Sequence, residues 1–157
     1  MEASKLILVR HAKSDWDIVV PDIDRPLASR GRRQAPRTGK WLAEQAFDLD
    51  LVALSPAVRA QETWRLIASQ WDASAPVRTY EALYTFSGTS LKHAIAGIAE
   101  AGSVLVVGHN PALEDLATQL TGQAARMVTS AVAVIEYASS DRWLNDGTLQ
   151  FCGRPGG

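Results

Sequence analysis

Two histidines follow short apolar segments of the chain. His11 comes after Leu6–Arg10, and His109 comes after Val104–Gly108. A short apolar run closed by a polar residue predicts a strand buried on both faces, so both imidazoles should emerge at strand ends. Ligand sites in open α/β sheets gather outside the carboxyl ends of the strands. We therefore expect both histidines to lie at a ligand site.

Two arginines accompany these histidines. Arg10 directly precedes His11, and Arg59 follows a third apolar run, Leu51–Leu54, at the predicted start of a helix. Guanidinium groups hold phosphate through paired, charge-assisted hydrogen bonds, and helix N-termini add N–H donors. An imidazole with a pKa near its reference value of about 6.5 is unprotonated at neutral pH and can attack phosphorus. The pattern predicts a phosphate site, although neither glycine-rich nucleotide motif occurs.

Length and composition limit the classes of protein that this chain can form. Its 157 residues, of which 46% are hydrophobic and 21% charged, predict a single globular domain over residues 1–157. The net charge of -1 argues against a nucleic-acid partner. No apolar stretch approaches the roughly 18 residues of a membrane span, so we expect a cytoplasmic protein without a membrane partner. The single cysteine, Cys152, predicts neither a disulfide nor a metal site.

Strand and helix signals alternate along the chain, which predicts an α/β fold. We expect a three-layer sandwich with a mostly parallel central sheet and helices on both faces. Two C-terminal strands, Ala131–Tyr137 and Thr148–Cys152, should close one edge as an antiparallel pair, with a turn signal between them. Further elements are expected at Pro76–Thr79 (edge strand), Val58–Trp71 and Ser90–Ala99 (helices), and from Pro111 onward (helix).

The first helix and the loop before it carry several polar signals. Ala12–Ala28 is long for a connection, and loops of this length are often functional. Trp16 in this loop could form a wall of the pocket. Ser29 is the predicted helix N-cap, and Pro36 predicts an interruption or a kink in the helix. Four arginines of this helix favour a solvent-exposed face: Arg30, Arg32, Arg33 and Arg37.

Three motifs in this order resemble the histidine phosphatase superfamily. They are Arg10-His11-Ala12, the segment Ser55-Pro56-Ala57-Val58-Arg59-Ala60-Gln61-Glu62-Thr63, and Gly108-His109-Asn110-Pro111. The short chain, the segment Asp24-Arg25-Pro26-Leu27 and an acidic helix start after the third motif resemble the small SixA-type phosphohistidine phosphatases. The similarity extends from about Leu6 to Phe151. It implies a phosphoglycerate mutase-like fold.

The resemblance also implies a role for each residue of the three motifs. His11 would be the nucleophile that becomes phosphorylated, and Arg10 and Arg59 would bind the transferred phosphoryl group. His109 would donate a hydrogen bond to that group as charge shifts in the transition state. These roles suit phosphoryl transfer, which depends mostly on positioning and on stabilising charge. The resemblance implies no metal and no other cofactor.

Three further residues are candidates for the site in this comparison. Arg25 and Ser14 are candidates for contact with phosphate or substrate, and a surface salt bridge is the other interpretation of Arg25. Glu81 is the one obvious candidate for the general acid that phosphomonoesterases of the superfamily use, but its surroundings do not match their pattern. A phosphohistidine can leave as a neutral imidazole without such an acid. The sequence therefore favours phosphohistidine on a protein as the substrate.

Two alternatives to this function stay open at the level of sequence. The chain could be a broad phosphomonoesterase or mutase-like enzyme acting on small phosphate esters. It could also be a noncatalytic module that binds phosphorylated partners, although a binding module needs no nucleophile.

Overall fold

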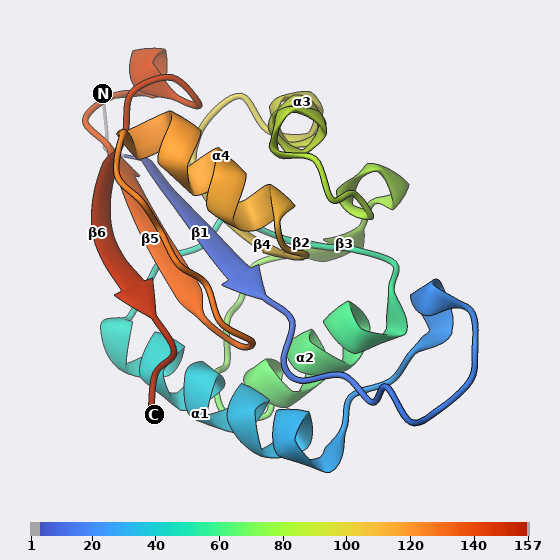
Figure 1. The fold of residues 1–157 in the computed structure, drawn as a ribbon. Coiled ribbons are helices and arrows are strands. Elements are labelled where there is room, and N and C mark those ends of the chain that lie inside the picture. The colour runs from blue at the N-terminus through green and yellow to red at the C-terminus, as the bar shows by residue number, and fades with distance from the viewer. Residues whose placement is uncertain (1–3, 157) are drawn as a thin grey trace.

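Within residues 4–156, which a computed structural model describes, the chain forms one six-stranded sheet covered by helices on both faces (Figure 1). The strands are β1 (Ser4–Arg10), β2 (Leu51–Leu54), β3 (Val77–Thr79), β4 (Ser103–Gly108), β5 (Val132–Tyr137) and β6 (Thr148–Gly153). The α-helices are α1 (Ser29–Gln45), α2 (Val58–Ala68), α3 (Gly88–Ile98) and α4 (Ala112–Thr121). Short 3-10 helices are η1 (Asp22–Asp24), η2 (Glu81–Leu83) and η3 (Ser140–Arg142). The predicted α/β sandwich is confirmed.

The strands lie in the order β3-β2-β4-β1-β5-β6. Pairing is parallel from β3 to β1, whereas β5 runs antiparallel to both β1 and β6. The predicted antiparallel pair at the C-terminal edge is therefore confirmed. The helix after β1 and the helix after β4 cover opposite faces of the sheet (Figure 1). Their connections diverge between two neighbouring strands, which opens a crevice at the carboxyl ends of β1 and β4.

Alternation along β1 explains why the sheet needs both helical layers. Leu6 and Leu8 pack on the side of α3 and α4, whereas Ile7 and Val9 pack on the side of α1 and α2. All four side chains are fully buried. Because successive side chains of a strand point to opposite faces, a continuous apolar run must be covered twice. The central strands are therefore rigid supports for the residues at their ends.

Helix α1 differs from its prediction at two positions. Ser29 is the first helical residue and Ala28 is the N-cap, without a side-chain capping bond, so the capping prediction was wrong. Pro36 lies inside a helix that is continuous over seventeen residues, so the interruption is not observed. The helix packs closely on α2 at Gly39, where a Cβ would lie 2.5 Å from the Ile67 carbonyl oxygen. Tertiary packing of this kind can outweigh the loss of one backbone hydrogen bond.

Other element boundaries shift by a few residues, as expected at helix and strand ends. α2 ends at Ala68 instead of Trp71, and α3 begins at Gly88 instead of Ser90. Pro111 is the N-cap of α4, one residue before the helix begins. Along residues 4–156, no helix combines the length and apolar character that crossing a bilayer requires.

Candidate active site

Sheet register places the two histidines side by side. Arg10 of β1 pairs with Gly108 of β4, so the next residue of each strand, His11 and His109, leaves the sheet at the same edge. Their ring centroids are 5.3 Å apart. Both side chains are buried, with exposed fractions of 7% for His11 and 1% for His109. The crevice between diverging connections therefore holds an imidazole pair.

The His11 ring is held with one nitrogen available for attack. Its Nδ1 lies 2.7 Å from the carbonyl oxygen of Ala12, which can only accept, so Nδ1 carries the proton. The lone pair then resides on Nε2, which accepts a long hydrogen bond of 3.4 Å from Nε of Arg59. Burial, and to a smaller degree the neighbouring positive groups, lower the pKa of His11 to about 3. The side chain is therefore a neutral potential nucleophile at pH 7.

The His109 ring is oriented by Ser55, which follows β2. The Ser55 hydroxyl oxygen accepts a hydrogen bond from the Ala57 N–H at 3.2 Å and lies 2.7 Å from His109 Nε2. If the hydroxyl donates to Nε2, the proton of the neutral ring resides on Nδ1. Burial, with Arg59 as the next cause, lowers the pKa of His109 to about 4, so the ring is neutral. Nδ1 is buried without a hydrogen-bond partner among residues 4–156 and is available to a ligand oxygen.

Arg10 lines the same pocket at the end of β1. Its Nη1 donates to the Met127 carbonyl oxygen at 3.1 Å, which fixes one edge of the guanidinium group. Asn110, next to His109, donates to the same carbonyl at 2.7 Å and to Glu114 at 2.9 Å. Arg10 Nε is buried and has no partner in the part of the chain that the structure describes. A guanidinium group held in this way retains donors for a phosphoryl oxygen.

Asp22 contacts the arginines on the opposite side of the pocket. Its carboxylate accepts from Arg59 Nη2 at 3.0 Å and from Arg25 Nη1 at 2.6 Å, and its carbonyl oxygen accepts from Arg59 Nη1 at 2.7 Å. Tyr84 also donates its hydroxyl proton to this carboxylate. Hydrogen bonds from Tyr84, Arg25 and Arg59 hold the pKa of Asp22 well below its usual range, against an opposing effect of burial. An ionised carboxylate thus occupies the donors that a phosphate would use.

The loop before α1 brings Arg25, Ser14 and Trp16 to this pocket. Arg25 is buried, and its Nε donates to the Ser14 hydroxyl oxygen at 3.0 Å. The Trp16 ring lies 3.6 Å from the Arg25 guanidinium carbon and lines the pocket, whose volume is about 260 Å³. Ser14 also forms an isolated bridge with Leu27, which closes the base of the loop. The structure therefore brings the loop candidates together with the strand-end residues.

Glu81 is not part of this group. It begins the short helix η2, is exposed to solvent, and does not line the pocket. The turn directs Leu83 into the core instead. Within residues 4–156, Asp22 is the one carboxylate that lines the pocket, and it is ionised. Among the residues that the structure describes, the pocket therefore presents no protonated carboxyl group.

Sequence reasoning did not identify Asp22 or Ser55 as site residues. Ser55 follows a predicted strand, which is the signal that identified His109. Because Pro56 comes next, the pair was interpreted only as a turn between the strand and the following helix. Asp22 lies three residues before Arg25 in a loop rich in acidic side chains, so composition alone does not distinguish it. Phe86 was also missed, and its ring lies 5.4 Å from that of His109.

The fold and the pocket together define an α/β protein whose pocket is suited to binding a phosphoryl group. A model of the histidine phosphatase superfamily (branch 1) matches residues 6–89. An uncharacterised protein of Mycobacterium leprae is 33% identical over 150 residues, which cover 86% of this chain and 89% of that protein. The uncharacterised phosphatase PhoE of Bacillus subtilis is 26% identical, with 87% of this chain and 89% of that protein covered. The chain belongs to the histidine phosphatase superfamily.

A solved structure is similar over the whole chain. It is the structure of a protein from Nakamurella multipartitia that has been assigned to the SixA phosphohistidine phosphatases, with 27% identity and a TM-score of 0.84. The match covers 100% of this chain and 99% of that one. It confirms the phosphoglycerate mutase-like fold and the SixA-type resemblance indicated by the sequence. Membership of the superfamily supports a hydrolase of the phosphatase class.

Proposed function

We propose that the protein is a metal-independent phosphatase that removes phosphate from phosphohistidine on a protein through a covalent intermediate on His11. The observation that carries this proposal is a neutral nucleophile among arginine donors, in a pocket whose one carboxyl group within residues 4–156, Asp22, is ionised. An alkoxide leaving group needs a proton from such an acid, whereas an imidazole that keeps a proton on its other nitrogen leaves as a neutral molecule. The pocket therefore suits a phosphorus–nitrogen bond.

In the first step, the Nε2 lone pair of His11 attacks phosphorus, and the bond from phosphorus to the substrate imidazole breaks. The proton on Nδ1 stays hydrogen-bonded to the Ala12 carbonyl oxygen, which stabilises the positive charge that the ring acquires. Arg10 and Arg59 bind the equatorial oxygens, and His109 donates from Nδ1 to the same group. Fixed donors around oxygens that already carry charge contribute most of the stabilisation in phosphoryl transfer.

In the second step, water attacks the phosphorus of phospho-His11. The phosphorus–nitrogen bond breaks, its electron pair returns to Nε2, and the water proton passes to the departing phosphate or to solvent. Before the first step, the phosphoryl group of the entering substrate displaces the Asp22 carboxylate from Arg59, because both bind the same donors. Arg25 and Ser14 then contact the phosphate or the adjoining part of the substrate.

The test compares a phosphoramidate with a sugar phosphate as substrate, in the presence of chelator. We expect phosphoramidate hydrolysis to dominate, and His11→Ala to reduce it by several orders of magnitude. Alkaline quenching with labelled substrate should trap phosphohistidine on the protein. Full activity of His11→Ala would refute the mechanism, and lack of any phosphoenzyme would favour a noncatalytic binding module. Faster turnover of the sugar phosphate, strongly reduced by Glu81→Gln, would make the protein a phosphomonoesterase instead.

Three further expectations stay predictions of the sequence. They are a cytoplasmic location, a single domain over residues 1–157, and partners that include neither nucleic acid nor a membrane.

A further inference from the structure

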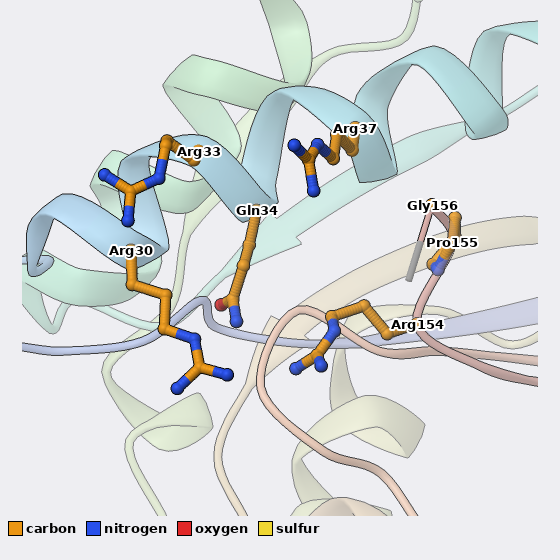
Figure 2. Close-up of a pocket in the computed structure, with 7 residues that line it drawn as sticks. All are labelled: Arg30, Arg33, Gln34, Arg37, Arg154, Pro155 and Gly156. Atoms are coloured by element: carbon orange, nitrogen blue, oxygen red, sulfur yellow. The ribbon is translucent and has the colours of Figure 1, made fainter.

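A second pocket lies beside the active site and is lined mainly by arginines (Figure 2). We call it the arginine pocket and define it by Arg30, Arg33 and Arg37 of α1 together with Arg154 after β6. Its volume is about 280 Å³. The three helical arginines lie at spacings of three and four residues, so they follow one face of α1 over about 10 Å. The face predicted to be merely exposed is thus one wall of a cavity.

The positive charge of the arginine pocket is not neutralised by residues 4–156. Arg30, Arg33 and Arg37 are exposed and form neither an ion pair nor a hydrogen bond with that part of the chain. Within residues 4–156, Arg154 donates only to Thr129, at 3.3 Å to its carbonyl oxygen and 3.4 Å to its hydroxyl. The whole protein has a net charge of -1, so this concentration of positive charge is local. Such a field attracts and orients anions.

Gln34 supplies a further donor to this pocket. Its side chain is directed into the protein and only 8% of the residue is exposed. The amide oxygen accepts from the Lys13 N–H at 3.0 Å, whereas the amide nitrogen has no hydrogen-bond partner within residues 4–156. Figure 2 shows the Gln34 side chain pointing into the space that Arg30 and Arg154 share. The bond from Lys13 fixes the Gln34 amide group, so its nitrogen is oriented to donate to a ligand oxygen in the pocket.

Two hydrogen bonds connect the arginine pocket to the active site. Gln34 bonds to Lys13, and Arg154 bonds to Thr129, while both Lys13 and Thr129 line the catalytic pocket. Lys13 is two residues from His11, so the Gln34 amide lies on the order of 10 Å from the nucleophile. The arginine pocket is therefore within reach of a protein-sized ligand bound at the active site.

We propose that the arginine pocket binds an acidic segment of the phosphorylated protein substrate, next to its phosphohistidine. This proposal rests on the function proposed above, because it assigns the second anion site to the same substrate. A row of guanidinium groups about 10 Å long exceeds the size of one phosphate and suits several carboxylates in sequence. The lining is arginine, glutamine, Pro155 and Gly156, without an aromatic ring on which a nucleotide base could stack.

The test uses two peptides that are phosphorylated on histidine by phosphoramidate and differ at four positions. One carries four glutamates three to six residues from the phosphohistidine, and the other carries four glutamines there. We expect the wild-type protein to show a KM roughly 10-fold lower for the glutamate peptide, with little change in kcat. The ratio should fall to about 1 in Arg30→Gln/Arg33→Gln, and also when salt rises from about 0.05 M to about 0.5 M.

Arg142→Gln is the matched control, because Arg142 is an exposed arginine paired with Asp146 on another part of the surface. It should keep the wild-type preference. Equal KM values for both peptides in the wild type, or a preference that persists in the double variant, would overturn the proposal. Binding of inorganic tripolyphosphate that depends on Arg33, without any peptide preference, would also overturn it and indicate a small polyanion.

A separate measurement distinguishes failure of docking from failure of the proposed function. Fluorescence anisotropy of a labelled, unphosphorylated glutamate peptide reports docking without catalysis. If the wild type hydrolyses neither phosphoramidate nor the phosphopeptides, the proposed function fails. Tighter binding of the glutamate peptide than of the glutamine peptide would in that case still support the arginine pocket as the binding site for acidic peptides. Equal binding of both would overturn the docking proposal whatever the activity.

Discussion

Acidification should destabilise this protein through its two buried histidines before the carboxylates begin to titrate. Burial lowers the pKa of His11 to about 3 and that of His109 to about 4, whereas a histidine in the unfolded chain titrates near 6.5. Below pH 6.5 the unfolded state therefore binds protons that the native state does not bind. The contribution that the two neutral histidines make to the free energy of unfolding is fully present above pH 6.5. It is lost progressively as pH falls toward the native pKa values.

The magnitude follows from the difference in proton binding. Between pH 7.5 and pH 5.0, protonation lowers the free energy of each unfolded histidine by about 2 kcal/mol. The native side chains gain almost nothing in this interval, because both pKa values lie at or below about 4. The two residues together should reduce the free energy of unfolding by about 4 kcal/mol, a large part of the total for a domain of this size.

The assay is urea unfolding at several pH values between 7.5 and 5.0. One common slope of the unfolding free energy against urea concentration is used at every pH. His11→Gln should make the loss of stability over this interval smaller by about 2 kcal/mol. His93→Gln, at an exposed position of α3, is the matched control and should keep the wild-type loss. A wild-type stability that does not change between these pH values, or the same loss in His11→Gln, would refute the reasoning.

Three further substitutions test single contacts. Ser55→Ala removes the hydroxyl that orients His109, and phosphoramidate kcat should fall roughly 10- to 100-fold, the effect that loss of a hydrogen bond orienting a metal-bound histidine has. Asp22→Asn removes a negative charge that competes with phosphate, so the inhibition constant of inorganic phosphate should fall about 10-fold. Gly31→Ala places a Cβ 2.1 Å from the Lys13 carbonyl oxygen and should cost about 3 kcal/mol of stability in urea unfolding.

Two of these substitutions have a control variant, and the third has an outcome that would contradict it. Gly97→Ala, where no atom lies within 4 Å of the new Cβ, should raise stability by about 0.5 kcal/mol through helix propensity. Ser55→Thr keeps a hydroxyl and should retain more activity than Ser55→Ala. If Asp22→Asn weakens phosphate inhibition, the carboxylate orients the arginines instead of competing with the ligand.

Local patterns in the sequence were sufficient for the layers of the fold and for the catalytic candidates at the strand ends. Apolar runs such as that of β1 indicate strands covered on both faces, because period-two alternation leaves no polar side. His11 and His109 could be selected because each follows such a run. Pro36 misled the prediction, since packing of α1 against its neighbours, which maintains the helix, involves residues distant in sequence.

The sequence by itself determined the residue types and the edge of the sheet at which they gather. Only the tertiary structure decided their chemical states and their partners. The proton on His11 is assigned by contact with the Ala12 carbonyl oxygen, and the His109 ring is oriented by Ser55, which is 54 positions away in the chain. Folding likewise unites Arg37 of α1 with Arg154 in one pocket. Burial and long-range contacts set pKa values, tautomers and charge clusters, because these properties depend on distance in space instead of distance along the chain.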